Sequence, residues 1–300
     1  MKIADGWEDY ELLDLRKGQK LERWGKHILL RPDPQVIWND SVNEKYSKVE
    51  PSATYLRSRE GGGRWTKNSL PESWNIKYKD LVFKVGMMGF KHTGLFPEQA
   101  YNWDYIREKI NAAKKAGHKN LKVLNLFAYT GGATVAAASC GAEVVHLDSA
   151  RGMVDWAKEN AKLSGLENAK IRYIVDDAKK FVEREIRRGN KYDGIIMDPP
   201  SYGRGKKGEI WSFEEDITPF IRNAVRLLSD DPQFIIINSY TTGISGEMIK
   251  NILKIAMAEE EKARNIKFKG SFSTDEVGLK VKDKDIYLPA GMYTRWERNE

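Results

Sequence analysis

The sequence predicts an α/β fold in which a doubly wound, mostly parallel sheet follows a small β-rich domain. From Lys122 onward, continuous apolar runs alternate with segments whose apolar residues recur at helical spacing. Strands buried on both faces read as such runs, and repeated strand–helix units with right-handed crossovers give a parallel sheet. Before about residue 90, short β-favouring stretches alternate with turn signals instead. We therefore expect a β-rich domain over residues 1–90, with a role in substrate recognition, and the α/β domain over residues 91–300.

The expected elements of the α/β domain follow from these runs. Strands are expected at residues 122–128, 143–149, 171–177, 192–198 and 233–239. Helices are expected at residues 100–116, 132–140, 151–165, 178–188 and 214–228, and a further helix carries Ile249, Ile252, Leu253 and Ala256 on one face. The last part of the chain is compatible with a terminal strand pair at residues 268–277 and 287–298.

The first 90 residues contain five stretches that favour β-structure, at residues 10–15, 27–32, 35–38, 74–80 and 81–87. Turn-forming residues separate them, including the glycine run at residues 61–63. Six of the nine tryptophans lie at or before Trp103. The simpler interpretation is that these aromatic side chains pack a small β core, and the alternative is that some of them stack on bases.

Composition and charge narrow the class of protein. The chain of 300 residues is 41% hydrophobic, which is enough for a core, yet no apolar run approaches the ~18 residues of a membrane helix. The net charge of +7 favours polyanionic partners such as nucleic acid. The first residues lack the apolar stretch of a signal peptide, and one cysteine with four scattered histidines gives no metal-binding pattern. We expect a cytoplasmic protein with no metal and no membrane partner.

The residues suited to chemistry should follow the strands, because ligands of a doubly wound sheet bind beyond the carboxyl ends of its strands. The first strand leads into N-L-F-A-Y-T-G-G-A at residues 125–133, where two glycines permit a tight turn and close approach of a ligand to the backbone. The G-x-G-x-x-G pattern of dinucleotide enzymes is absent there, which argues against a pyrophosphate loop. An ordinary strand–helix turn is the alternative.

The second and third strands end in carboxylates. Asp148 could accept hydrogen bonds from both hydroxyls of an adenosine ribose, and its negative charge would repel a ribose phosphate. Asp177, which follows Asp176, could accept a hydrogen bond from an adenine amino group. Each of these strand ends could instead cap the helix that comes next.

The fourth strand ends in Asp198-Pro199-Pro200-Ser201-Tyr202, the most specific signal in the chain. The prolines fix the backbone and lack N–H groups, so carbonyl oxygens are left to accept hydrogen bonds beside a carboxylate and an aromatic ring. This set suits an amino-bearing planar base, with a proline-rich strand exit as the alternative. Residues 203–211 then form a glycine-rich basic loop. Its predicted substrate contacts are Arg204, Lys206 and Lys207 to phosphate and Trp211 to a base, unless Trp211 packs on the core.

Together these motifs resemble the class I S-adenosylmethionine-dependent methyltransferases, and more narrowly the bacterial large-subunit ribosomal RNA methyltransferase family, which includes base-C5 and base-N7 modifiers. Its members carry L-N-x-F-x-Y-T-G-G/S, an acidic strand end and D-P-P-x-F/Y, matched here by residues 124–132, Asp148, Asp177 and residues 198–202. The resemblance covers roughly residue 91 to the C-terminus and implies a Rossmann-like fold with S-adenosylmethionine as cofactor. It further implies that residues 92–99, which fit the family's G-x-x-x-D/E-Q element, fold over the methionine end of that cofactor.

The site prediction has two parts. Asp198, Pro199, Pro200 and Tyr202 orient the acceptor base. Within the cofactor set, residues 129–131 hold the methionine moiety, Asp148 the ribose and Asp177 the adenine. The full set expected to contact S-adenosylmethionine is Phe96, Pro97, Gln99, Asn125, Phe127, Ala128, Tyr129, Thr130, Gly131, Asp148, Ser149, Asp176, Asp177, Ala178 and Asp198.

The absence of a suitable cysteine bears on the acceptor atom. Methylation of a pyrimidine C5 requires a cysteine thiolate that attacks C6. Family members that perform it carry this cysteine after the fifth strand, where this chain has N-S-Y-T-T at residues 238–242. A base nitrogen needs no covalent step, so we predict a nitrogen of ribosomal RNA as the acceptor. Ser201 stands where amino-group methyltransferases have an aromatic residue, so an exocyclic amine and a ring nitrogen both stay open.

Three other functions stay open. The chain could methylate a protein or a small molecule, or it could bind RNA without catalysis. It could also be a nicotinamide-dependent oxidoreductase, against which the missing G-x-G-x-x-G pattern argues. The sequence does not indicate the oligomeric state.

Overall fold

The computed structural model describes residues 1–58, 62–67, 70–205 and 208–299. The chain divides into two compact units. The first contains Met1–Tyr101 and Val277–Ala290, and the second contains Asn102–Glu276 and Gly291–Glu300. This division differs from the expected boundary at residue 90, because the first unit extends to Tyr101 and a later segment returns to it.

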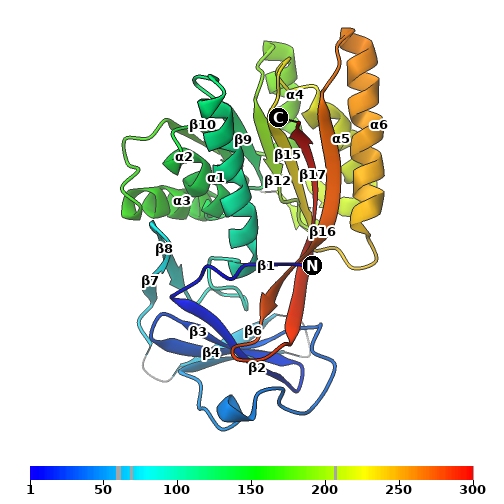
Figure 1. Cartoon of the computed structure of the whole chain (residues 1–300). Helices are drawn as coiled ribbons and strands as arrows, with labels where there is room; N and C mark the ends of the chain where they lie inside the picture. Colours follow the sequence, from blue (N-terminus) through cyan, green and yellow to red (C-terminus); the bar gives the residue numbers. More distant parts are fainter. Residues whose placement is uncertain (59–61, 68–69, 206–207, 300) are drawn as a thin grey trace. The chain divides into compact units, whose positions relative to one another are not determined.

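The second unit contains the predicted mostly parallel sheet (Figure 1). Its strands are β9 (Lys122–Leu126), β10 (Glu143–Asp148), β11 (Ile171–Val175), β12 (Gly194–Met197), β15 (Phe234–Ser239), β16 (Gly270–Lys280) and β17 (Tyr287–Arg298). They lie in the order β16-β17-β15-β12-β9-β10-β11, in which β15, β12, β9, β10 and β11 run parallel and β17 pairs antiparallel with β15. The predicted fold class is confirmed, and so is the terminal strand pair.

Helices cover both faces of this sheet. One face carries α1 (Ala100–Lys115), α2 (Gly132–Ser139) and α3 (Arg151–Leu163), and the other carries α4 (Ala178–Arg188), α5 (Phe213–Val225) and α6 (Gly246–Arg264) (Figure 1). Capping residues set several ends. Asp177 accepts the Lys180 N–H at the start of α4, and Gly189, at φ 68°, ends that helix. Ser245 caps α6 in the same way, by accepting the Met248 N–H.

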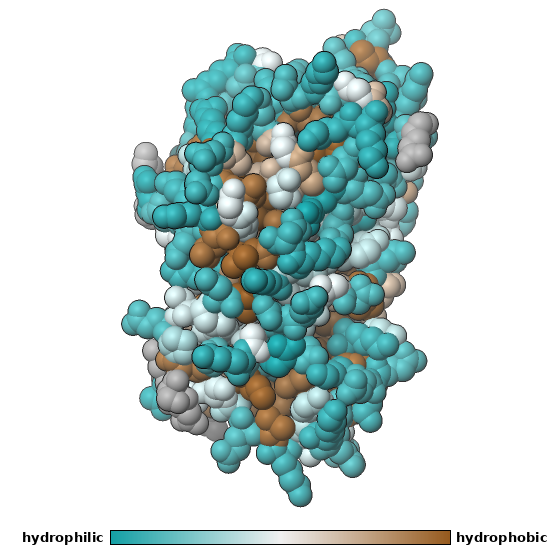
Figure 2. Space-filling view, turned by 60° about the vertical axis from the view of Figure 1, so that its left-hand side comes forward, coloured by the Kyte–Doolittle hydropathy of each residue, from teal (hydrophilic) through white to brown (hydrophobic). Residues whose placement is uncertain are grey.

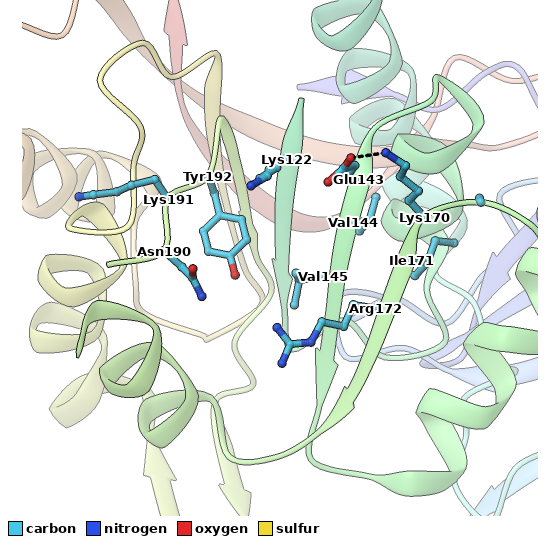
Figure 3. A pocket seen from close by; sticks show the side chains of 11 residues that line it. Lys122, Glu143, Val144, Val145, Lys170, Ile171, Arg172, Asn190, Lys191 and Tyr192 are labelled. Carbon is cyan, nitrogen blue, oxygen red and sulfur yellow. Dashed lines mark hydrogen bonds and ion pairs between the residues drawn. The ribbon is translucent and has the colours of Figure 1, made fainter. Parts of the chain in front are cut away.

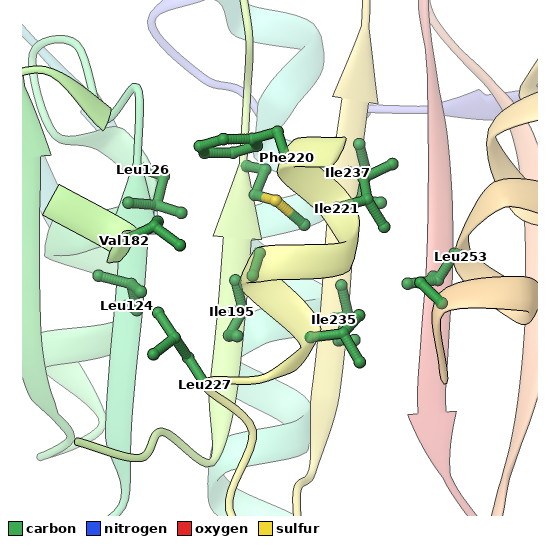
Figure 4. Packing of buried hydrophobic residues seen from close by; sticks show 14 of the residues in the cluster. Leu124, Leu126, Val182, Ile195, Phe220, Ile221, Leu227, Ile235, Ile237 and Leu253 are labelled. Carbon is green, nitrogen blue, oxygen red and sulfur yellow. The ribbon is translucent and has the colours of Figure 1, made fainter. Parts of the chain in front are cut away.

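Aliphatic and aromatic side chains fill the space between the sheet and the helices α4, α5 and α6 (Figure 4). Leu124, Ile195 and Ile235 lie on three neighbouring strands, and each is fully buried. Phe220 of α5 and Leu253 of α6 pack against this cluster. Each such side chain contributes about 1.5–3 kcal/mol by leaving water. The sheet is therefore a rigid platform for the loops at its carboxyl edge.

The first unit is β-rich, as predicted. Its strands are β1 (Lys2–Ile3), β2 (Tyr10–Arg16), β3 (Gln19–Trp24), β4 (His27–Pro32), β5 (Ala53–Arg57), β6 (Gly63–Lys67), β7 (Ser73–Tyr78) and β8 (Leu81–Gly86), with short helices η1 (Glu44–Tyr46) and η2 (Pro97–Gln99). One sheet has the order β2-β3-β4-β5-β6, and β7 pairs with β8. The strand expected at residues 35–38 does not form, whereas β3, β5 and β6 were not expected. Trp24 is fully buried, in agreement with the interpretation that the early aromatic residues pack a small β core.

The segment Val277–Ala290 completes the first unit. Val277 and Gly278 of β16 pair in parallel with Lys2 and Ile3 of β1. Beyond β16, the Lys282 N–H donates a hydrogen bond of 2.8 Å to the Leu12 carbonyl of β2.

On the face that Figure 2 shows, hydrophilic side chains dominate and apolar ones gather in separate patches. No helix in the described residues combines the length and the apolar character needed to cross a bilayer.

Candidate active site

The loop that follows β9 has an unusual backbone. Phe127 and Tyr129 adopt φ angles of 56° and 50°, in the left-handed region, and Gly131 follows at 84°. Such a conformation costs a non-glycine residue about 1–3 kcal/mol and persists only where the surroundings impose it. At Gly131 a side chain is also excluded by space, since a Cβ there would lie 2.8 Å from the Cβ of Ala157 in α3. Strain of this kind is concentrated at functional sites, and here it falls on the predicted cofactor loop.

Neighbouring elements hold this loop through its backbone. The Tyr129 N–H donates to Oδ2 of Asp148 at 2.9 Å, which ties the loop to the end of β10. The Ala128 N–H donates to the Leu147 carbonyl at 2.9 Å. Asn160 of α3 donates its side-chain N–H to the Thr130 carbonyl at 2.8 Å.

Asn160 was not predicted from the sequence. Its side chain is fully buried on the face of α3 that also buries Val154, Ala157 and Ala161. An amide in the middle of such an apolar helix face is a signal in the sequence, because a buried amide needs a polar partner. The partner here is the cofactor loop.

A buried polar chain supports the loop from below. The Asn125 side chain donates to Oγ1 of Thr134 at 2.9 Å, and that oxygen lies 2.9 Å from Nδ1 of His146. All three side chains are buried, and burial lowers the pKa of His146 to about 3. Asn125 therefore supports the loop with its side chain, and its predicted contact with the cofactor stays a prediction.

Asp148 is arranged as an acceptor. One carboxylate oxygen accepts the Tyr129 N–H, and the other accepts the Ala150 N–H at 2.8 Å. Burial raises the pKa of this carboxyl, while its backbone hydrogen bonds act in the opposite direction. Among the described residues no cationic side chain pairs with it. A carboxylate has about four acceptor positions, so Asp148 keeps capacity for the two hydroxyls of a ribose, as a nucleoside cofactor requires.

The acidic pair after β11 is already engaged by the protein. Asp177 accepts the Lys180 N–H at 2.9 Å as the cap of α4, and Asp176 pairs with Arg184. The alternative interpretation of Asp177, that it caps the next helix, is therefore observed in the structure. An adenine contact would use the second carboxylate oxygen of Asp177. Beside this pair Ala178 is buried, and Ser149 is exposed at the end of β10.

The predicted acceptor segment lies directly beside the cofactor loop. The chain leaves β9 toward β10 on one side and returns to β12 on the other, so the switch point of the sheet lies between β9 and β12. There the Asp198 N–H donates to the Leu126 carbonyl at 3.3 Å. Pro199 is buried, Asp198 is half-buried, and Tyr202 is 55% exposed. The structure thus brings residues 127–131, Asp148 and Asp198 to one edge of the sheet.

One expected feature of this segment is different. The Pro200 carbonyl already accepts a hydrogen bond of 2.6 Å from the indole N–H of Trp211, although it was expected to be available to a substrate. The ring of Trp211 is only 6% exposed, with its centroid 5.0 Å from Phe127 and 5.2 Å from Phe220. No base can stack on it without displacing these rings. Trp211 therefore packs on the core, which was the alternative to its predicted substrate contact.

The glycine-rich segment after Tyr202 is a small hairpin, although a loop was expected. Strand β13 (Tyr202–Arg204) pairs antiparallel with β14 (Ile210–Ser212), and Trp211 stands opposite Gly203. Arg204 is exposed and donates to the Tyr202 hydroxyl at 2.9 Å. The predicted phosphate contacts Lys206 and Lys207 lie outside the described residues.

The other predicted cofactor contacts belong to the first unit. Pro97 and Gln99 are buried in η2, and Phe96 precedes them with its ring centroid 5.5 Å from that of His92. The Pro97 carbonyl accepts the indole N–H of Trp7 at 2.9 Å. The predicted contacts Phe96, Pro97 and Gln99 thus lie in the first unit, whereas the predicted contacts from Asn125 onward lie in the second.

A hollow of about 430 Å³ lies elsewhere on the second unit (Figure 3). It is lined by the first residues of β9, β10 and β11 together with the segment before β12. These are the amino ends of the parallel strands, and Lys122, Glu143 and Arg172 stand at its edge. Ligands of such sheets bind at the carboxyl ends, so this hollow is not the candidate site.

Comparison with known proteins agrees with this geometry. The family model described as S-adenosylmethionine-dependent methyltransferase matches residues 54–241, which is more than half of the chain. The chain belongs to this family. A crystal structure of the SAM-dependent methyltransferase from Agrobacterium tumefaciens is 31% identical, covers 99% of this chain and 93% of that one, and superimposes with a TM-score of 0.89. The predicted class of enzyme and the predicted cofactor are thereby confirmed.

Two curated relatives are named as ribosomal RNA methyltransferases. The methyltransferase is 33% identical over 202 residues to ribosomal RNA large subunit methyltransferase K/L of Shewanella frigidimarina, a match that covers 64% of this chain and 26% of that protein. It is 28% identical over 265 residues to ribosomal RNA large subunit methyltransferase K of Neisseria meningitidis serogroup B, covering 82% and 72%. The chain thus spans about a quarter of the length of the first relative.

Proposed function

We propose that this methyltransferase transfers the methyl group of S-adenosylmethionine to a nitrogen of a base in ribosomal RNA, in the cytoplasm. The observation that carries the proposal is the position of Asp198 and Pro199 beside the cofactor loop at the switch point. A carboxylate and a fixed backbone carbonyl beside the predicted cofactor loop support an acceptor site at this edge of the sheet. Both are hydrogen-bond acceptors, as the amino edge of a base requires.

The chemistry of the acceptor atom follows from the one cysteine in the chain. Cys140 follows the last residue of α2, a helix that begins at the cofactor loop and leads away from it. Its thiol is buried and lies 3.8 Å from the Arg107 carbonyl. No thiolate can therefore reach a pyrimidine C6 at the carboxyl edge. A nitrogen lone pair displaces the methyl group directly, so positioning and electrostatics are sufficient.

Each residue of the edge then has a physical task. The cofactor, when bound, supplies an electrophilic methyl group on a sulfonium sulfur. Asp148 accepts hydrogen bonds from the ribose, while the backbone of residues 129–131 orients the methionine moiety. Asp198 and the Pro199 carbonyl accept hydrogen bonds from the base and turn its nitrogen lone pair toward the methyl group. If the acceptor is an exocyclic amine, the Asp198 carboxylate is placed to accept the proton that leaves.

The choice of RNA as substrate has two supports besides the site. Two relatives at 28% and 33% identity carry the name of ribosomal RNA methyltransferases. The net charge of +7 attracts polyanions over distances of a Debye length.

The test is methyl transfer from radiolabelled S-adenosylmethionine to ribosomal RNA from cells that lack the protein, followed by mass spectrometry of the nucleosides. Label on a base nitrogen in the large-subunit RNA is the expected result. A 5-methylpyrimidine would overturn the argument from the cysteine. Label in protein or small molecules, with none in RNA, would overturn the substrate class.

A further inference from the structure

A group of positive charges lies on the first unit, apart from the residues assigned above. Lys20 of β3 stands opposite Arg31 of β4 in the strand register, and Arg57 ends the neighbouring strand β5. The carbonyl of Lys91, which follows β8, accepts a hydrogen bond from Arg31, and the charges of Lys20, Arg31 and Arg57 all lower the pKa of the Lys91 ammonium. These four residues are named the basic cluster. Like charges opposite one another destabilise a sheet unless carboxylates offset them.

Carboxylates offset only part of the basic cluster. Glu22 is fully buried and accepts hydrogen bonds of 2.6 and 2.8 Å from Arg31, and Lys20 lies 3.2 Å from Asp33. Arg31 also donates to the Lys91 carbonyl at 3.0 Å. By contrast, the side chains of Lys91 and exposed Arg57 make no hydrogen bond or ion pair with any described residue. Among the described residues, these are the two members of the basic cluster that have no ion-pair partner.

The repulsion among these cations affects the pKa of Lys91. Its side chain is half-buried, and burial followed by the charges of Lys20, Arg31 and Arg57 lowers the pKa of its ammonium, against the opposite effect of Asp33. An anion at this position would remove the repulsion. Charge-assisted hydrogen bonds to a phosphate are the interaction that such cations favour.

An exposed aromatic side chain precedes Lys91. Phe90 is 64% exposed, which is unusual for so large an apolar group. Its backbone is held in place, because the indole N–H of Trp65 in β6 donates to the carbonyls of both Met88 and Phe90, at 3.0 and 3.1 Å. The protein thus presents a phenyl ring to solvent from an anchored segment, immediately before Lys91 in the chain.

We propose that the basic cluster and Phe90 bind an unpaired stretch of RNA, with a backbone phosphate against Lys91 and Arg57 and a base stacked on Phe90. Aromatic rings beside cations recognise single strands, because a duplex hides the faces of its bases. The proposal rests on the proposed function in taking RNA as the substrate, and it adds how the first unit selects the unpaired part of it.

The test measures binding of the full-length protein to a labelled oligoribonucleotide without internal pairing, and to a duplex of equal length, by fluorescence anisotropy at several salt concentrations. Phe90→Leu should weaken binding of the single strand about tenfold and leave the duplex unchanged, whereas Phe90→Tyr should bind normally. Lys91→Ala should weaken binding of both RNAs and reduce the salt slope by about 1. Matched controls are Ile37→Ala, an apolar side chain that is 89% exposed, and Lys48→Ala, an exposed lysine of the same unit.

The outcomes separate this inference from the proposed function. If Phe90→Leu and Lys91→Ala bind the single strand as tightly as their controls while the wild type methylates RNA, the binding site is overturned and the function stands. If the wild type neither binds nor methylates RNA, both fail. Far-ultraviolet circular dichroism and denaturant unfolding, compared with the wild type, check that the first unit of each variant is folded, since all of these residues belong to that unit.

Discussion

The carboxylate of Asp148, at the end of β10, accepts the backbone N–H of Tyr129 at 2.9 Å in the loop after β9. The same carboxylate accepts the Ala150 N–H. One side chain thus joins two strand ends and helps to hold Tyr129 in its left-handed conformation. The residue assigned to the ribose is also a support of the loop assigned to the methionine moiety.

Asp148→Asn should therefore weaken the binding of S-adenosylmethionine. The amide keeps the shape of the side chain but turns a donor toward one of the two backbone N–H groups, at a cost of about 1–3 kcal/mol. Calorimetric titration should show at least a tenfold loss of affinity. Asp155→Asn, at an exposed carboxylate of α3, is the control and should bind the cofactor normally. Equal affinities would remove Asp148 from the site.

Gly131→Ala should affect both stability and cofactor binding. The substitution forces an alanine into a left-handed conformation, which costs about 1–2 kcal/mol, and it adds a collision with Ala157. Gly165→Ala is the matched control, because its φ is 72° but no atom lies within 4 Å of the added Cβ. Denaturant unfolding should show a lower free energy of unfolding in both variants, with the larger decrease in Gly131→Ala. Only Gly131→Ala should lose affinity for the cofactor. Similar behaviour of the two would show that the contact with α3 is unimportant.

His146 should make the stability of the second unit depend on pH. Burial lowers its pKa from 6.5 to about 3, so the folded protein keeps it neutral where the unfolded chain would bind a proton. Its contribution is complete above pH 6.5 and is lost as the pH falls toward 3, by up to about 1.4 kcal/mol per pH unit. In His146→Asn, the stability difference between neutral and mildly acidic buffer should shrink by this amount. An unchanged pH profile in denaturant unfolding would show that folding does not lower the pKa of His146.

Trp211→Phe should separate packing from hydrogen bonding in the hairpin. Phenylalanine preserves the ring contact with Phe127 and Phe220 but leaves the Pro200 carbonyl without its donor. A loss of about 1 kcal/mol in unfolding free energy is expected, together with slower methyl transfer and unchanged cofactor affinity, since Pro200 belongs to the acceptor side. A base-stacking role would instead predict weaker RNA binding with full stability.

Asp198→Ala should abolish methyl transfer and leave the binding of S-adenosylmethionine largely unchanged. The carboxylate is assigned to the acceptor, and loss of a positioned acid–base group reduces rates by about 10²–10⁴-fold. Transfer assays and calorimetric titration on the same preparation measure both quantities. Asp230→Ala, an exposed carboxylate before β15, is the control. Full turnover in Asp198→Ala would mean that the acceptor site lies elsewhere.

The parallel strands could be predicted because burial on both faces leaves a direct mark on the sequence. All six residues of β15, for example, are buried. The strand β3 leaves no such mark, since its residues include the charged Lys20, Glu22 and Arg23. The buried Glu22 is neutralised by Arg31 of the next strand, and it also accepts a hydrogen bond from the Tyr10 hydroxyl of β2. A partner that is distant in sequence decides such a strand, and local pattern does not reveal it.

The candidate site shows the same limit. Parallel strands end at one edge, so the sequence sufficed to bring Asp148, Asp198 and the glycine-containing loop together. The direction of Trp211 depends on the register of the hairpin, in which it stands opposite Gly203. The role of Asn125 depends on Thr134 and His146, which lie on other elements. Sequence motifs predicted the residues of the site, while tertiary contacts determine which of their side chains are already engaged within the protein.

The return of Val277–Ala290 to the first unit has a consequence for biosynthesis. When residues 1–101 have left the ribosome, the segment that pairs with β1 and binds the Leu12 carbonyl of β2 has not yet been translated. The nascent first unit therefore exposes a strand edge for most of the time that the chain is being made, and such edges attract other chains. A fragment that stops at Tyr101 should for this reason aggregate. Chaperones that bind exposed strand edges should increase the yield of folded protein more when they are present during translation than when they are added after it.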